Sequence, residues 1–358
     1  MNHPSICLLL ISCSLLVACS SNDVTRIEAE QAGATQTDQG RYRNAYRDIE
    51  YPDNCEADCY LPHPLVECQQ PGENCQYTGD NPTTNLNAGF EITWLGHASF
   101  KIQSPDGQQL LFDPVSQQFD WPVNWAFRLS DGFNRNTPQW PDSEQLQDTA
   151  GVFYSHLHYD HFNKADVRRI GTEAEFFVPL DMASNLPRGG YRITEMDWYT
   201  QTSLGPLTVH AVPAHHFNSR VWVPFLYEDE NRALWSGWII EYEGKKLFFA
   251  GDTGYSPHFK DIQQRYGDMD ICLLPIASYH HEEHGNWYRY VHTTPEDTLA
   301  AAEDLQCKSI IPWGYGNASW KMGDHSSHSA LIRLLNVYPD SSRQIPLLIL
   351  NEGETVKL

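Results

Sequence analysis

The sequence predicts an α+β domain in which helices cover the outer faces of β-sheets. From residue 86 onward, short apolar runs of strand length follow one another and are separated by turn residues. Helical patterns stand between some of these runs but not between all of them, so strands are expected both singly and in hairpins. No internal repeat or break in composition divides residues 86–358, which favours one large domain.

The expected strands are runs rich in branched and aromatic residues. They lie at 91–97, 99–103, 108–114, 151–156, 174–179, 207–214, 235–243, 245–252, 269–277, 309–315 and 346–354. Helices are expected at 163–171, 256–267 and 294–306. The last of these begins Thr294-Pro295-Glu296-Asp297, with proline in the first turn and carboxylates near the positive end of the helix dipole.

The formal net charge of the 358-residue chain is -22, and no run of Lys or Arg is present. Attraction to a phosphate backbone is therefore hard to argue, and nucleic acid is excluded as a partner.

The first residues hold a short apolar run that ends in small residues, as secretory signals do. Leu16-Val17-Ala18-Cys19 resembles the lipobox of bacterial lipoproteins, in which the chain is cut before a cysteine that then carries lipid. The resemblance implies a signal peptide at 1–18 and a membrane anchor at Cys19. Ser20 rather than Asp after the cysteine implies the outer membrane, with the domain facing the periplasm. An ordinary cleaved signal peptide is the alternative.

Residues 19–48 are polar with little apolar periodicity, so they are predicted to be a flexible tether. Residues 49–85 form a Pro- and Gly-rich collar with Cys55, Cys59, Cys68 and Cys75. Too little apolar area is available there for folding by burial, so two disulfides are expected, with three possible pairings and a zinc knot as the rival.

Two further cysteines, Cys272 and Cys307, belong to the main domain. Cys272 lies within an apolar run, and both are expected to be small core residues rather than ligands.

The stretch "SHLHYDHFN" at 155–163 carries the strongest chemical signal in the chain. It places His156, His158, Asp160 and His161 where a predicted strand passes the chain to a helix. Alternation along extended backbone sends His156 and His158 to the same side, so that they can chelate one ion. Asp160 and His161 follow as the chain bends and can face a second position, as in two-metal hydrolytic sites.

Further candidate ligands stand at the ends of other predicted strands. His215 and His216 follow the strand at 207–214, and Asp252 follows the strongly apolar strand at 245–252. A carboxylate directly after a buried strand is costly unless it meets a cation, although a turn aspartate is the alternative for Asp252.

The order "TWLGH", "LLFDP", "SHLHYDHF", "PAHH", "AGDTGY", "LPIASY" and "PWGYG" resembles the metallo-β-lactamase superfamily. Within it, the sequence is similar to the branch of N-acyl-phosphatidylethanolamine-hydrolysing phospholipase D and its bacterial relatives. The resemblance covers roughly residues 90 to 335 and implies an αββα sandwich of two mixed sheets flanked by helices, with a hydrolase domain at 86–358.

The resemblance also implies roles for individual residues. His156, His158 and His216 would bind a first zinc ion, Asp160 and His161 a second, and Asp252 both. His215 becomes a neighbour in the site wall. Asp160 would orient the attacking water, and His292 would contact the leaving or non-bridging oxygen. His97 and Asp113 would orient ligands, with a purely structural role as the alternative for each.

The sequence departs from this family at Pro312, which stands where the branch has a ligand histidine before Trp313 and Gly314. Proline cannot bind zinc, so the sequence predicts closer to one tightly held ion than two. The alternatives are an inactive protein or a substitute ligand from the histidines at 280, 281 and 284 or at 325 and 328. Each of these five can also be plain solvated surface.

The function implied is a zinc-dependent phosphodiesterase of phospholipase D type, acting on N-acylated or ordinary glycerophospholipids. The aromatic segment 119–140 is a candidate acyl-chain groove or membrane lip, or simply packing between layers. The alternatives are a lactonase or cyclic phosphodiesterase on the same scaffold and a non-enzymatic metal-binding envelope lipoprotein.

Overall fold

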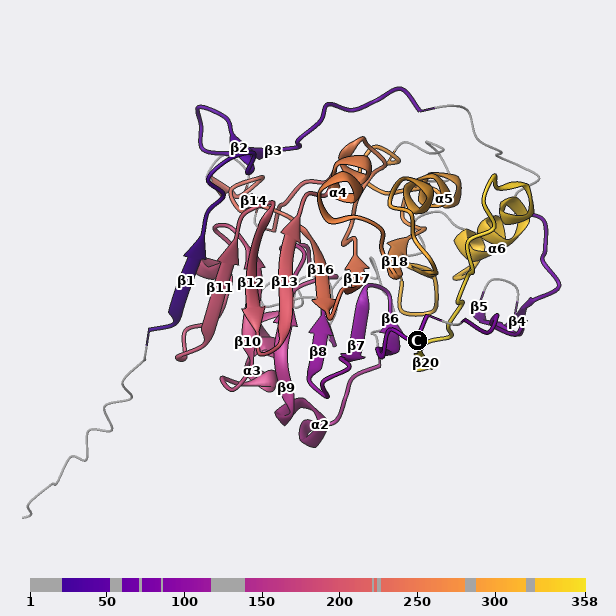
Figure 1. Ribbon diagram of the computed structural model, residues 1–358, viewed down its shortest axis with the longest axis horizontal. Helices are drawn as coiled ribbons and strands as arrows, with labels where there is room; N and C mark the ends of the chain where they lie inside the picture. The colour runs from indigo at the N-terminus through magenta and orange to yellow at the C-terminus, as the bar shows by residue number, and fades with distance from the viewer. Residues whose placement is uncertain are drawn as a thin grey trace, which may run out of the picture.

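The computed structural model describes residues 21–51, 60–70, 73–84, 86–116, 139–220, 222–223, 227–280, 288–319 and 326–358. The strands form two large sheets that pack face to face (Figure 1). Among the described residues, no helix is long and apolar enough to cross a membrane.

The larger sheet is mixed, with parallel pairing from β1 to β8 and antiparallel pairing from β8 to β20. Its strands, in order of neighbours, are β1 (Asp23–Ile27), β11 (Arg192–Met196), β10 (Glu175–Pro179), β9 (Thr149–Phe153), β8 (Gln109–Phe112), β7 (Ser99–Gln103), β6 (Glu91–Gly96) and β20 (Thr355–Lys357).

The second sheet is also mixed, antiparallel from β12 to β17 and parallel from β17 to β19. Its strands, in order of neighbours, are β12 (Thr200–Leu204), β13 (Leu207–Val212), β16 (Gly237–Tyr242), β17 (Lys245–Phe249), β18 (Ile271–Pro275) and β19 (Ile310–Trp313). Short hairpins β2–β3 (Thr35–Gln36, Tyr42–Arg43), β4–β5 (Val66–Gln70, Glu73–Tyr77) and β14–β15 (Trp222–Val223, Tyr227–Glu228) stand apart from both sheets.

The side chains of each central strand alternate between two apolar layers, as a period of two requires. On β9, Phe153 points to the layer between the sheets, where it meets Trp238 of the second sheet at 5.7 Å between ring centroids, while Val152 joins the layer under the helices. Phe112 and Phe249 make a similar contact between the sheets, at 5.2 Å. The core between the sheets is therefore largely aromatic.

Helices cover both outer faces of the sandwich. α2 (Ser143–Gln147) and α3 (Lys164–Ile170) contact each other and pack on the larger sheet. α4 (His258–Tyr266), α5 (Pro295–Asp304) and α6 (Ser329–Val337) pack on the second sheet (Figure 1). The predicted αββα sandwich is confirmed, as are the three predicted helices. Thr294 and Asp297 form a reciprocal capping box at the start of α5.

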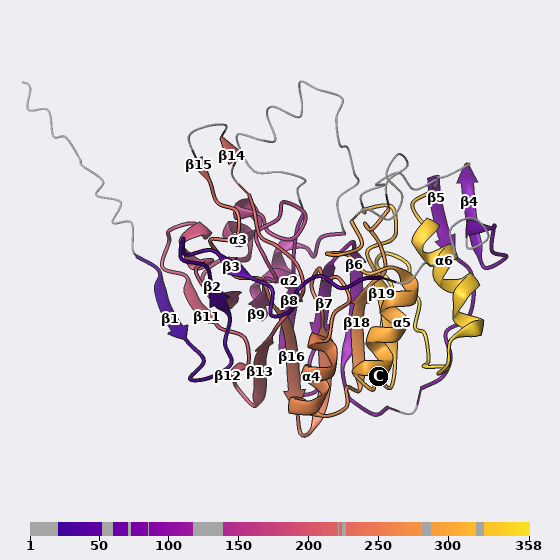
Figure 2. The ribbon, with the colours of Figure 1, turned by 90° about the horizontal axis from the view of Figure 1, so that it is seen from above.

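The N-terminal segment differs from its prediction. Instead of a flexible tether, residues 23–27 form β1 and pair in parallel with β11 over five residues. Residues 44–51 then run across the molecule from β3 toward α5 (Figure 2). The prediction is wrong for this part because backbone pairing, and not an apolar face, holds an edge strand whose side chains are almost all exposed.

The collar prediction is confirmed in part, since Cys68 and Cys75 form a disulfide across the β4–β5 hairpin. Cys55 and Cys59 lie outside the described residues, as do Cys19 and the signal segment. Cys272 and Cys307 lie in the core as expected, but they are joined by a disulfide. This link ties β18 to the chain directly after α5.

One predicted strand is not formed. The run at 346–354 makes only a single bridge, between Leu347 and Ile310, because β19 is the last strand of its sheet and this segment follows it for one residue alone.

Candidate metal centre

The candidate ligands meet where several strands end at one edge of the sandwich. The loop at 154–163 connects β9 to α3, and Asn163 caps α3 by accepting from the backbone N–H of Ala165. Asp252 follows β17 and His216 follows β13. Gly251 has φ +62°, and a Cβ there would press on the Ser155 side chain. Only glycine lets the two loops approach this closely.

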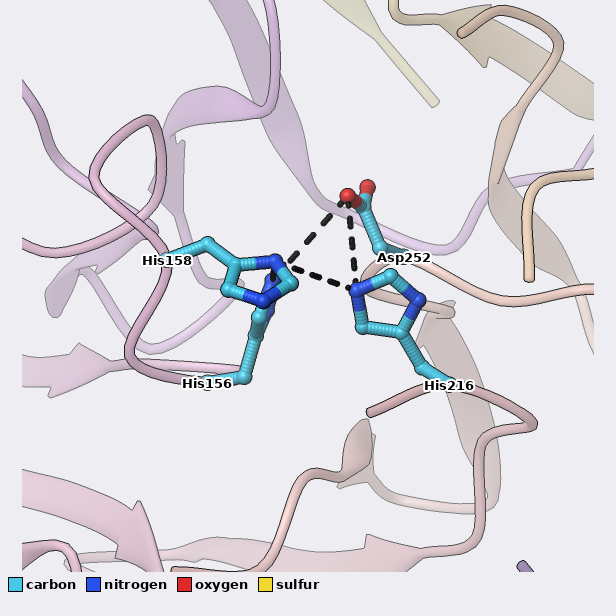
Figure 3. Close-up of side chains that lie close together, drawn as sticks. All are labelled: His156, His158, His216 and Asp252. Carbon is cyan, nitrogen blue, oxygen red and sulfur yellow. Dashed lines mark hydrogen bonds and ion pairs between the residues drawn. The ribbon is translucent and has the colours of Figure 1, made fainter. Parts of the chain in front are cut away.

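Four side chains, His156, His158, His216 and Asp252, form what we call the first group. Figure 3 shows them pointing toward one common point, with His156 and His158 on one loop and His216 and Asp252 on two others. His158 Nδ1 lies 2.8 Å from His156 Nε2 and 3.3 Å from His216 Nε2, and Asp252 Oδ2 lies 4.0 Å and 3.9 Å from those two nitrogens. Ligands of a tetrahedral zinc ion, with bonds of about 2.0 to 2.1 Å, lie about 3.3 to 3.4 Å apart. The spacing fits one ion.

Hydrogen bonds on the far side of the rings orient the first group. His216 Nδ1 donates to the carbonyl oxygen of Val291 at 3.1 Å, so its Nε2 carries the free lone pair. His156 Nδ1 lies 2.8 Å from Ser155 Oγ. Both rings therefore present Nε2 to the common point.

A second group, His97, Asp160 and His161, adjoins the first. His161 Nδ1 lies 2.7 Å from the buried carboxylate of Asp113, which fixes the proton on Nδ1. His161 Nε2 is buried without a hydrogen-bond partner, although Asp252 Oδ2 is 3.1 Å away. A buried imidazole nitrogen and a carboxylate oxygen at this distance are placed as two ligands of one cation would be. Asp252 Oδ2 thus faces both groups.

The pKa shifts agree with a site built for cations. Burial lowers the pKa of His156 and His216 well below its usual range and that of His158 to about 4. These imidazoles are neutral at pH 7, the form that binds metal. Burial opposes ionisation of Asp160 and Asp252, yet His161 holds both carboxyl pKa values well below their usual range.

His161 behaves in the opposite way. Burial works against its protonation, but Asp252, Asp160 and Asp113 together raise its pKa well above the usual value. Three carboxylates around one ring create a strong preference for positive charge at this point, which a divalent ion would satisfy.

Two further residues predicted from the sequence, His292 and His215, lie around the metal groups. His292 Nδ1 donates to Ser278 O at 2.7 Å, and its Nε2 lies 3.2 Å from Asp252 Oδ2, at the rim of the site. His215 lies in the wall, where its Nε2 is 2.9 Å from Asp48 Oδ1. Phe217 and Tyr288 add an aromatic wall beside His158 and His292.

Of the substitute histidines that the sequence offers, His292 comes within 3.2 Å of Asp252 Oδ2, whereas His280 and His328 contact other residues. His280 packs against Tyr60, and His328 lies beside Tyr315 and Ser327. His281, His284 and His325 lie outside the described residues, as does the aromatic segment except Trp140. Sequence reasoning gave His97 an orienting role, and in the structure its ring nitrogen lies within 4.8 Å of the possible ligand atoms of Asp160 and His161. Like Asp252, His97 stands at the end of a predicted strand, but its neighbours in space are not visible in the sequence.

Comparison with known proteins gives a consistent picture. The family described as "Beta-lactamase superfamily domain" matches residues 108–315. An uncharacterized protein of Mycobacterium tuberculosis is 30% identical over 256 residues, covering 68% of this chain and 63% of the relative. N-acyl-phosphatidylethanolamine-hydrolyzing phospholipase D 1 of Caenorhabditis elegans is 28% identical over 244 residues, covering 63% of this chain and 64% of the relative. The matched regions thus span less than two thirds of these relatives.

The fold has counterparts among solved structures. A metallo hydrolase from the archaeon Ignicoccus hospitalis superposes with a TM-score of 0.54 at 20% identity, covering 75% of this chain and 98% of the other. At that level of identity the likeness concerns the fold.

Proposed function

This chain belongs to the β-lactamase superfamily, and on that premise we propose that it is a metal-dependent phosphodiesterase of phospholipase D type. The observation that carries the proposal is the presence of two adjoining groups of ligand atoms, each with its atoms within 4.8 Å of one another, with Asp252 Oδ2 of the first group 3.1 Å from His161 Nε2 of the second. Zinc is the metal proposed, because the donors are mainly imidazoles with a few carboxylates.

Two divalent ions held here would supply a nucleophile from water at neutral pH and neutralise charge on a phosphoryl group. The protein's own part begins with Asp160, which is ionised and can accept a hydrogen bond from the attacking water. His292 stands at the rim with its Nδ1 proton committed to Ser278 O. A proton held at its Nε2 can be donated to the leaving or non-bridging oxygen.

A glycerophospholipid, N-acylated or not, is the proposed substrate. The named activity of the nematode relative supports this choice. The aromatic wall of Phe217 and Tyr288 beside the site also supports it, since it offers an apolar surface next to the reacting group.

The test is hydrolysis of N-acyl-phosphatidylethanolamine, phosphatidylethanolamine and a soluble phosphodiester by protein stripped of metal and reloaded with zinc. Asp160→Asn should lower turnover at least about a hundredfold and leave the first group's ion bound. Metal-loaded protein that cleaves lactones or cyclic nucleotides but none of these phosphodiesters would point to another hydrolase on this scaffold.

We also propose a lipid-anchored place in the cell envelope, facing the periplasm. Two disulfides, Cys68–Cys75 and Cys272–Cys307, support an oxidising compartment. Cys19→Ser should release the protein from membranes, as followed by fractionation, and unchanged membrane association would contradict a lipid anchor.

A further inference from the structure

The second group lacks the ligand histidine that the family has in its last strand motif. Pro312, in the position of the family's last histidine, lies buried in β19 opposite Leu274 and offers no nitrogen to a metal. Asp160, His161 and the shared Asp252 would leave an ion with three protein ligands. Among the residues that the structure describes, the side chain that joins Asp160 and His161 in one group is His97.

The distances suit coordination by His97. Its Nε2 lies 3.0 Å from Asp160 Oδ2, and His161 Nε2 lies 3.8 Å from the same oxygen and 3.1 Å from Asp252 Oδ2. These values bracket the spacing of about 3.3 to 3.4 Å expected between ligands of a tetrahedral zinc ion. The ring nitrogen of His97 is thus placed as a ligand would be.

The hydrogen bonds around His97 indicate where its proton lies. Ser319 Oγ donates its single proton to the carbonyl oxygen of Tyr315 at 2.7 Å, so it can only accept from His97 Nδ1, 3.1 Å away. With Nδ1 directed at Ser319, Nε2 is the His97 nitrogen turned toward the Asp160 carboxylate. At 3.0 Å this contact requires a proton or a cation between the two atoms, so Nε2 stands where a metal ligand would.

His97 repeats the arrangement of the other ligands in this site. His161 and His216 also commit Nδ1 to an acceptor on the far side and present Nε2. The backbone at His97 is fixed as well, since it has φ +49° in the turn between β6 and β7 and its carbonyl accepts from Trp94 Nε1 at 2.9 Å. The ring is held in place before any ion arrives.

We propose that His97 is a ligand of the second metal ion, where it takes the place left by Pro312, together with Asp160 and His161, while Asp252 Oδ2 faces this ion from the first group. This inference rests on the proposed metal-dependent function. It changes the expected metal content from the single tight ion that the sequence predicts to two.

The experiment measures metal content and zinc affinity of the full chain, by elemental analysis and by titration of stripped protein. The unmodified protein should bind two ions and His97→Ala one. A matched control is His210→Ala, which removes another buried histidine with a carboxylate partner, Glu241, on the helix-covered face beside Tyr266. This control should keep both ions.

Two further variants separate coordination from structural support. His97→Cys loaded with cobalt should show a thiolate-to-cobalt charge-transfer band, which a residue that only positions Asp160 would not produce. His97→Ala combined with Pro312→His should regain the second ion by returning a histidine to the family's position.

The outcomes distinguish the two proposals. Two ions of unchanged affinity in His97→Ala, or no charge-transfer band in His97→Cys, would overturn the assignment of His97. A single ion in the unmodified protein would also overturn it, and hydrolysis of phosphodiesters by that one-ion protein would still support the proposed metal-dependent function. An unmodified protein that binds no metal would remove the proposed function itself.

Discussion

The two metal groups lie side by side, with Asp252 of the first group facing His161 of the second, yet their origins in the sequence differ. The first group draws on one dense loop and two strand ends, each marked by its own short motif. The second takes Asp160 and His161 from that loop but needs His97 from a hairpin turn about sixty residues earlier. The comparison shows that a loop can specify one site completely and a neighbouring site only in part.

The largest effect is expected at the residue that both groups use. Asp252→Asn keeps the shape of the side chain but removes the charge that faces His161 Nε2 at 3.1 Å. Both ions should bind more weakly, and turnover should fall on the order of a thousandfold, or about 4 kcal/mol of barrier. Zinc titration and turnover of the same sample check this. Weakening of one ion alone would mean that Asp252 belongs to a single group.

The sequence predicts the first group better than the second for a physical reason. His156 and His158 share a side because of local alternation, and His216 and Asp252 follow apolar strands whose ends must meet at one edge. The place of His97 depends on how the β6–β7 turn reaches that edge, which no local pattern encodes. The sequence shows that residue 97 is a histidine, but it does not show that this histidine lies beside Asp160 and His161.

The fold also has parts that the sequence predicts and parts that it does not. Central strands such as β9 and β17 are predictable because their apolar runs must be buried. β1 is not, because an exposed edge strand is held by its backbone. The disulfide of Cys272 and Cys307 was also missed, since a cysteine in an apolar run reads as core whether or not it is paired. Pairing depends on where the end of α5 comes to lie.

A smaller and more selective effect is expected at Asp113, which holds the Nδ1 proton of His161 and also accepts from the Ser155 hydroxyl at 2.5 Å. Asp113→Asn keeps an acceptor but removes the charge that raises the basicity of His161. The second ion should bind about 10 to 100 times more weakly. The first ion should change less.

Titration of the two ions in Asp113→Asn, followed by the same titration in Ser155→Ala, measures this difference. Ser155 also contacts His156 Nδ1, so its loss should touch both groups. Equal weakening of the two ions in Asp113→Asn would contradict the selective role given to this carboxylate.

The smallest effect is expected from the N-terminal segment, and it should fall on the first group. Asn44 Oδ1 accepts from the backbone N–H of His216 at 2.9 Å, so this segment holds the loop that carries a first-group ligand. Asn44→Ala removes one hydrogen bond, worth about 0.5 to 1.5 kcal/mol, which corresponds to about a two- to tenfold weaker first ion. The second ion should be unaffected, because no contact of Asn44 reaches His97 or His161 among the described residues.

The control is Arg43→Ala. Its side chain hydrogen-bonds within its own hairpin, to Thr35 and Gln36, in the described structure. Equal affinities in Asn44→Ala and Arg43→Ala would show that the segment crosses the first group without supporting it.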